Sequence, residues 1–206
     1  MSLEKYKIDM QNERESLTFY GENNQPIGIV DRNAGIDRGL LLEGVQLWVI
    51  NPDNNQVLMQ RRSKNKKNNP GKIDVSVSAH VKPNETATQA MLREANEEIG
   101  LEQQALYEIM QKFADDKIDL SKHGRQGKYI MHFYFAFLNN PLDAYTKQDD
   151  EVEELFFMDY EEIKRRVRNN DSEMLMPKSE SAEKIFSILD EKIRTRNSKE
   201  RLEEQK

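Results

Sequence analysis

The chain has 206 residues, of which 36% are hydrophobic and 33% are charged, and its formal net charge is -6. This length suits one domain with short extensions, and the acidic balance argues against binding to a nucleic-acid duplex, which needs a basic surface. The absence of cysteine excludes disulfides, thiolate metal sites and a cysteine nucleophile.

The sequence carries no sign of membrane targeting. Its first residues, MSLEKYKIDMQNERE, lack the apolar stretch of a signal peptide. No apolar run in the sequence approaches the roughly 18–20 residues that a membrane-spanning helix needs. We therefore expect a soluble, cytoplasmic protein without a membrane partner. The polar N-terminal segment is a candidate contact in a homodimer.

The first half of the chain is typical of short strands separated by turns and loops. Residues 1–16 are polar and show no period, so we expect an N-terminal extension, then a single domain at 17–196 and a charged tail at 197–206. Residues 31–40 are expected to form a loop. The strands predicted in this half cover residues 17–20, 27–30, 41–50, 57–61 and 73–81.

One central helix separates these strands from the second half. It is predicted to begin at Asn84 or Glu85 and to run to Ile99, with Gly100 as its stop. The order of strands, helix, strands and C-terminal helices indicates a mixed α/β fold, with a sheet flanked by helices. The later strands are predicted at 104–113, 127–138 and 152–158, and the C-terminal helices at 160–169 and 179–196.

Three glutamates of the central helix share one arc. At about 100° per residue, Glu97 and Glu98 fall on either side of Glu94. This arc borders the apolar stripe and not the polar face, so the carboxylates lie toward the side that faces protein. Like charges at this spacing repel, and partial burial raises the cost. A hard divalent cation such as Mg²⁺ would neutralise them, and a structural salt-bridge network is the equally weighted alternative.

The same segment resembles the Nudix box, G-x5-E-x7-R-E-U-x-E-E-x-G-U, in which U is a bulky apolar residue. Two positions depart from it, because Ala79 stands where the family has its first glycine and Ala95 stands at an apolar position. The residues that match the motif at its spacing are Glu85, Arg93, Glu94, Glu97, Glu98, Gly100 and Leu101.

The resemblance covers residues 17–165 and includes features of the Nudix subgroup related to isopentenyl-diphosphate isomerase, such as Gln60-Arg-Arg-Ser63 and Pro70-Gly-Lys-Ile-Asp-Val-Ser76. It implies a Nudix α/β/α sandwich, in which a mixed sheet is flanked by the box helix and the C-terminal helices. It also implies Mg²⁺ as cofactor, with Mn²⁺ as a substitute, and a small pyrophosphate substrate. By the same resemblance the metal ligands are Glu94, Glu97 and Glu98, Arg93 orients a box glutamate, and Glu85 and Gly100 support the motif.

In the family a further glutamate outside the box often serves as a base or as an extra metal ligand. The segment Glu151-Val-Glu-Glu-Leu-Phe-Phe-Met158 resembles the strand that follows that residue, which favours Glu151, with Glu153 as the fallback. Solubilising charges at a sheet edge are the equally weighted alternative. The catalytic candidates are therefore Glu151, Glu97 and Arg93.

The basic loop after the fourth predicted strand offers weaker candidates. Arg61 and Arg62 lie at the end of that strand and could contact substrate phosphates. The lysines that follow, at positions 64, 66 and 67, are expected only to be solvated.

Three functions fit this pattern. The favoured one is Mg²⁺-dependent hydrolysis of a nucleoside diphosphate linked to another moiety, or of a similar small pyrophosphate. The first alternative is isomerisation of isopentenyl diphosphate. There the resemblance places a metal-binding histidine, matched by His80, and a catalytic cysteine, replaced here by Ser78, which is a far weaker acid. The second alternative is a non-catalytic Nudix binding module, against which the complete acidic cluster argues.

Overall fold

The computed structural model describes residues 15–203, so the expectations for residues 1–14 and 204–206 lie outside the described part of the chain. The strands are β1 (Ser16–Tyr20), β2 (Pro26–Asp31), β3 (Leu41–Ile50), β4 (Gln56–Arg62), β5 (Ile73–Asp74), β6 (Val77–His80), β7 (Gln111–Asp119), β8 (Lys128–Phe137) and β9 (Val152–Asp159). The helices are α1 (Arg32–Asp37), α2 (Ala87–Ile99), α3 (Gln103–Ile109), α4 (Tyr160–Arg168) and α5 (Glu180–Glu203), with short 3-10 turns η2 (Leu120–His123) and η3 (Leu142–Ala144).

The strands of residues 15–203 join in one mixed sheet, which is divided in its middle. β3 runs parallel to β8 and β9 runs antiparallel to β4, but β3 and β4 pair at one position only. Beyond this position, β3 pairs with β6 and β4 pairs with β5. Ser76 lies in the chain between β5 and β6. Its hydroxyl donates to the Leu58 carbonyl of β4 at 2.6 Å and accepts from the Val49 amide of β3 at 2.9 Å. The single strand predicted at 73–81 is therefore two short strands that fill the gap.

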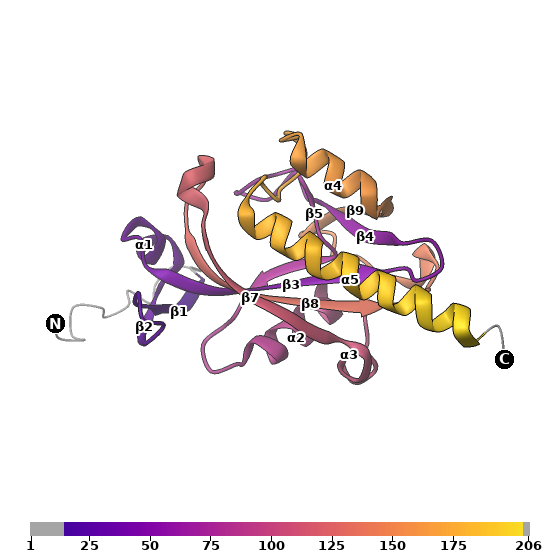
Figure 1. Ribbon diagram of the computed structural model, residues 1–206. Coiled ribbons are helices and arrows are strands. Elements are labelled where there is room, and N and C mark those ends of the chain that lie inside the picture. Colours follow the sequence, from indigo (N-terminus) through magenta and orange to yellow (C-terminus); the bar gives the residue numbers. More distant parts are fainter. Residues whose placement is uncertain (1–14, 204–206) are drawn as a thin grey trace.

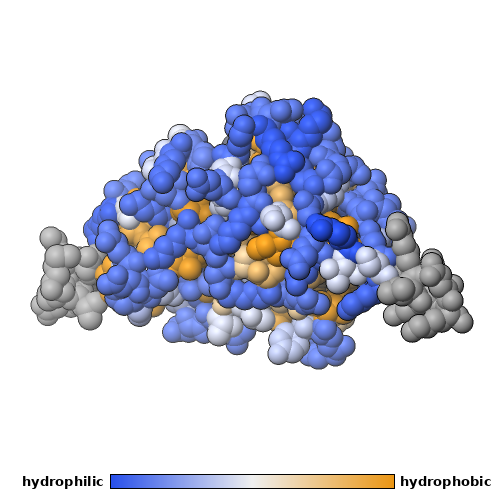
Figure 2. Space-filling view, in the orientation of Figure 1, coloured by the Kyte–Doolittle hydropathy of each residue, from blue (hydrophilic) through white to orange (hydrophobic). Residues whose placement is uncertain are grey.

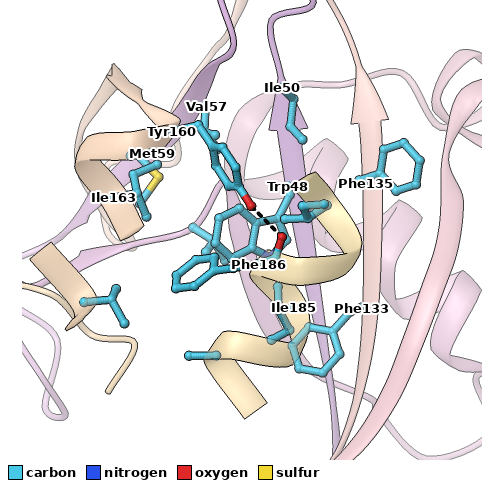
Figure 3. Packing of buried hydrophobic residues seen from close by; sticks show 14 of the residues in the cluster. Trp48, Ile50, Val57, Met59, Phe133, Phe135, Tyr160, Ile163, Ile185 and Phe186 are labelled. Atoms are coloured by element: carbon cyan, nitrogen blue, oxygen red, sulfur yellow. Dashed lines mark hydrogen bonds between the residues drawn. The ribbon is translucent and has the colours of Figure 1, made fainter. Parts of the chain in front are cut away.

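Alternation along β3 assigns its side chains to two cores. Trp48 points to the face covered by α4 and α5, whereas Leu47 and Val49 point to the face covered by α2 (Figure 1). On the first face Trp48 meets Phe186 edge-on, with 6.2 Å between ring centroids, and the Tyr160 hydroxyl donates to the Phe186 carbonyl at 3.0 Å (Figure 3). Both faces of the sheet are covered, which confirms the predicted sandwich and explains the apolar run at the end of β3, from Leu47 to Ile50.

The surface on the side of α5 is mainly hydrophilic, with hydrophobic side chains visible only in separate patches (Figure 2). This agrees with the high content of charged residues, 33%. None of the helices that the structure describes combines the length and the hydropathy that crossing a membrane would require.

The strand predicted at 104–113 is wrong over most of its length, because α3 occupies it and β7 begins only at Gln111. The Glu102 carboxylate accepts from the backbone amides of Gln104 and Ala105, at 2.9 and 2.6 Å, and so caps the helix. Leu106 turns into the core beneath α2. A local cap and one buried apolar side chain thus decide for helix over strand.

Other helix boundaries differ from the prediction where side chains cap them. Thr86 and Gln89 form a capping box, so α2 begins after Thr86 and not at Asn84 or Glu85. The Asp31 carboxylate caps α1, which lies inside the predicted loop at 31–40. At the other end of the chain, α5 continues past residue 196 to Glu203.

Candidate active site

Helix α2 carries the box glutamates along the edge of its buried side. Its apolar side chains pack against the sheet in the same core as β3. Glu98 follows this side and is 6% exposed, while the side chains of Glu94 and Glu97 are 15% and 46% exposed. Neighbouring carboxylates of one helix therefore stand at three depths, from buried to open.

Both departures from the motif are accommodated locally. Ala79 lies in β6 opposite Val45, so its backbone is extended and does not need glycine. Ala95 is buried where α2 packs closely on the sheet.

Glu98 is a buried carboxyl group that accepts a hydrogen bond from Gln60 Nε2 at 2.9 Å. Burial raises the pKa of Glu98 to about 8, the hydrogen bond from Gln60 opposes this, and the charges of Glu94 and Asp74 raise the pKa further. The group therefore holds a proton at neutral pH unless a cation offsets its burial.

Arg93 joins three box glutamates. Its Nε and Nη2 donate to Glu85 at 3.1 and 2.7 Å, and its Nη1 donates to Glu94 at 2.5 Å and to Glu97 at 3.2 Å. Glu85 in turn accepts from the Lys82 amide at 2.6 Å. The guanidinium thus fixes the helix to the loop before it and holds two of the predicted ligands.

The segment before β9 is bound to the end of α2. The amides of Thr146 and Gln148 donate to the carbonyls of Ile99 and Glu98, each at 3.3 Å. Gly100 ends the helix at φ +72°, and a Cβ there would lie 2.0 Å from Thr146 Oγ1. Glycine at this position allows both the left-handed backbone and the close approach of the segment that carries Glu151.

These elements surround a cavity of about 620 Å³ that reaches both faces of the divided sheet. On the side of α2 it is lined by acidic and cationic side chains, among them Glu94, Glu97, Glu98, Glu151, Arg62 and Lys66. On the side of α5 it is lined mainly by apolar side chains, among them Tyr129, Met131, Phe133, Met176 and Ile185.

The structure brings together most of the residues singled out in the sequence. This cavity is lined by Glu94, Glu97, Glu98, Glu151 and Arg62. Arg93 pairs with Glu94 and Glu97 and is itself held by Glu85. Two candidates lie elsewhere. Arg61 pairs with Glu154 at 3.5 Å and with Glu173 at 3.9 Å, and Glu153 pairs with Lys64 at 2.7 Å.

The carboxylates suit a divalent metal ion by their chemistry. All are oxygen donors, as Mg²⁺ and Mn²⁺ prefer, and the buried Glu98 would be stabilised by a nearby cation. Within residues 15–203, no three histidine, aspartate or glutamate side chains are arranged as a ready-made metal site. Glu94 and Glu97 are turned to Arg93, and Glu151 is turned to Lys66. The donor set fits such an ion, and these ion pairs would open to admit it.

Several residues of the site were missed in the sequence. Lys66 was expected to be solvated, but its side chain is 24% exposed and lines the cavity. Gln60 lies 38 positions from Glu98, so no local pattern connects them. Asp74 is buried in the gap of the sheet. A charged residue between two apolar ones, Ile73 and Val75, is the signal in the sequence that could have indicated a buried acid.

Curated relatives share the pattern. The chain is 29% identical over 167 residues to Nudix hydrolase 3 of Arabidopsis thaliana, an alignment that covers 75% of this chain and 20% of that protein. It is 24% identical over 162 residues to isopentenyl-diphosphate Delta-isomerase 1 of Photorhabdus laumondii, with 76% and 86% covered. The chain therefore spans about a fifth of the length of the first relative.

Solved structures share the fold. The chain resembles DR0079 of Deinococcus radiodurans with a TM-score of 0.63 and 21% identity, over 84% of this chain and 99% of that one. It resembles a bifunctional NMN adenylyltransferase/ADP ribose pyrophosphatase of Francisella tularensis, complexed with AMP and a Mn ion, with a TM-score of 0.53 and 21% identity, over 74% and 42%.

The family model described as the NUDIX domain matches residues 41–177. That span runs from β3 to the loop before α5 and includes the box helix, the gap in the sheet and the segment with Glu151. It covers more than half of the sequence. The chain belongs to the NUDIX domain family.

Proposed function

We propose that the protein is a Mg²⁺-dependent hydrolase that cleaves a pyrophosphate linkage in a nucleoside diphosphate linked to another moiety, or in a similar small substrate. One observation carries the proposal. Four carboxylates from two separate segments, Glu94, Glu97, Glu98 and Glu151, line one cavity together with cationic side chains. Carboxylates to hold a metal cation and cationic side chains to hold phosphates are the two requirements for cleaving a pyrophosphate linkage.

The chain's own residues divide the work. Glu94, Glu97 and Glu98 would hold Mg²⁺, or Mn²⁺ in its place, which supplies charge neutralisation for the two phosphates. Arg93 keeps two of these carboxylates in position. Glu151 would accept the proton of the attacking water as its oxygen bonds to phosphorus and the bridging P–O bond breaks. Arg62 on the cavity wall would bind a phosphate oxygen.

The far part of the cavity would receive the group that the diphosphate carries. A volume of about 620 Å³ exceeds what a diphosphate alone needs, and the side toward α5 is largely apolar. Tyr129 offers aromatic surface there. A ring system or another group with apolar surface suits this end.

A screen for product release, in which the nucleoside monophosphate and the other phosphorylated product are separated from the substrate by chromatography, tests the proposal. It would compare nucleotide sugars, dinucleoside polyphosphates, nucleoside triphosphates and prenyl diphosphates, each with Mg²⁺ and with a chelator. We expect Mg²⁺-dependent release from at least one nucleoside diphosphate derivative. Release that is equal in the chelator would contradict the proposed metal dependence.

Isomerisation of isopentenyl diphosphate is the second candidate, because His80 lines the same cavity and stacks on Tyr129 at 6.1 Å between ring centroids. Ser78, also in the cavity wall, is a poor proton donor compared with cysteine. We expect no dimethylallyl diphosphate from isopentenyl diphosphate and Mg²⁺, either with the wild type or with Ser78→Cys. Clear conversion by the wild type would decide for the isomerase.

The cytoplasmic location, the homodimer, and the lack of a membrane or nucleic-acid duplex partner stay predictions. Size-exclusion chromatography with light scattering would test the homodimer.

A further inference from the structure

The backbone at Lys66 is held close to the acidic cluster. The Lys66 amide donates to the Ser63 carbonyl at 3.1 Å, and the Ser63 amide donates to the Glu151 carbonyl at 2.9 Å. Ser63 itself is buried, with 5% of its surface exposed. The backbone that carries Lys66 is thus tied to the backbone that carries Glu151, so the nearness of their side chains does not depend on a free loop.

The ammonium group of Lys66 lies among carboxylates. It forms an ion pair with Glu151, and both side chains line the cavity. The pKa of Lys66 is lowered by burial and by the charge of Arg62, and the charges of Glu98, Glu15 and Glu94 oppose this without reversing it. Acids from three separate segments, which carry Glu15, the box glutamates and Glu151, thus surround this ammonium group.

Two internal cations thus divide the acidic cluster between them. Arg93 binds Glu94 and Glu97, and it is anchored by Glu85. Lys66 binds Glu151. A divalent ion held by Glu94, Glu97 and Glu98 would bring its positive charge into the cavity that Lys66 lines, and like charges confined in one partly buried site repel.

We propose that Lys66 is a built-in counter-ion of the acidic cluster, which a divalent cation must displace from Glu151 before the site can act. The inference rests on the metal site of the proposed function. Metal binding and release of Glu151 are then one linked event. A carboxylate paired with Lys66 cannot accept a proton from water as readily as a free one, so the pair keeps the site inactive until the ion arrives.

The test measures Mn²⁺ affinity by calorimetry on metal-free protein without substrate. Lys66→Met should bind Mn²⁺ more tightly than the wild type, by at least about fivefold, the low end of coupling between linked sites. Lys66→Arg keeps the charge and should stay near the wild type. Lys64→Met is the matched control, because it removes the same charge from the same loop but its side chain is 77% exposed and pairs with Glu153.

The outcomes separate this inference from the function on which it rests. General damage to the fold would weaken metal binding, so tighter binding by Lys66→Met, with no change in Lys64→Met, supports the inference. Equal or weaker binding by Lys66→Met, beside clear binding by the wild type, overturns the inference and leaves the metal site standing. Absence of Mn²⁺ binding in every variant overturns both.

Discussion

Neighbouring acids at the start of β9 have different surroundings, and this separates their roles. Glu151 faces the cavity and Lys66, Glu153 pairs with Lys64 on the outside, and Glu154 pairs with Arg61. The side chain of Glu154 is 57% exposed. Charge alone does not distinguish these residues, but their position does.

Glu151→Gln should therefore lower turnover by on the order of 10²-fold or more, as expected when a positioned proton acceptor is removed. Glu154→Gln is the matched control, because Glu154 lies three residues further along the chain and pairs with Arg61. This change should be nearly silent. Steady-state kinetics on a substrate from the screen would measure both. Equal losses in the two variants would contradict the choice of Glu151.

The acids of the site can be predicted from the sequence better than the residues that contact them. The spacing of Glu94, Glu97 and Glu98 on one helix is local, so it can be recognised without a structure. Gln60 and Lys66 reach the site only through the pairing of β4 with its neighbours and the docking of a loop. Contacts between distant segments leave no local pattern, which is why these residues were missed.

A second group of charges connects four strands away from the cluster. The ring nitrogens of His132 lie 2.6 Å from Asp115 and 3.2 Å from Glu43, and Tyr20 donates to Glu43 at 2.6 Å. Carboxylates accept hydrogen bonds, so these contacts favour the protonated imidazole, which donates from both ring nitrogens. Burial lowers the pKa of His132, but the bonds to Glu43 and Asp115 outweigh it and raise the pKa above its ordinary 6.5.

A group whose pKa is raised by folding stabilises the fold fully below its unfolded value, and that contribution is lost as pH rises through the folded pKa. As the pH rises from about 6 to about 9, the wild type should therefore lose unfolding free energy through His132. His132→Gln should lack this component. Urea unfolding of both proteins at the two pH values measures the difference, and equal losses would contradict it.

At the scale of elements, the join between α2 and the segment before β9 decides whether the two halves of the site meet. Local signals predicted α2 and its stop at Gly100. They did not predict α3, because the cap at Glu102 and the burial of Leu106 compete with a strand-like sequence. Short elements depend on such single contacts, whereas a long helix with a regular apolar side does not.

Gly100→Ala should reduce both stability and turnover. It places a side chain on a left-handed backbone, which costs about 1 kcal/mol, and it also forces a clash with Thr146 that should bring the loss to at least about 2 kcal/mol. Gly124→Ala is the control, because Gly124 has φ +68° but open space around it. Urea unfolding and kinetics would compare them. A loss no larger than that of Gly124→Ala would show that the close approach is not needed.

At the scale of the whole molecule, the sandwich follows from patterns that the sequence displays. The apolar run of β3 predicts a strand buried on both faces, and the periodic helices supply the cover. The gap between β3 and β4 could not be predicted, since it depends on Ser76 bonding to both strands and on Asp74 lying between them. That gap connects the acidic end of the cavity to its apolar end.

The central claim is that the carboxylates of α2 hold the cation on which pyrophosphate cleavage depends. The most direct measurement is the rate of product release, followed as nucleoside monophosphate, against Mg²⁺ concentration. It compares the wild type with the double variant Glu97→Gln, Glu98→Gln and with the control Glu108→Gln on the exposed side of α3. The wild type and the control should release product only with Mg²⁺, and the rate of the double variant should fall by on the order of 10³-fold. Release by the double variant at the rate of the wild type would contradict the account.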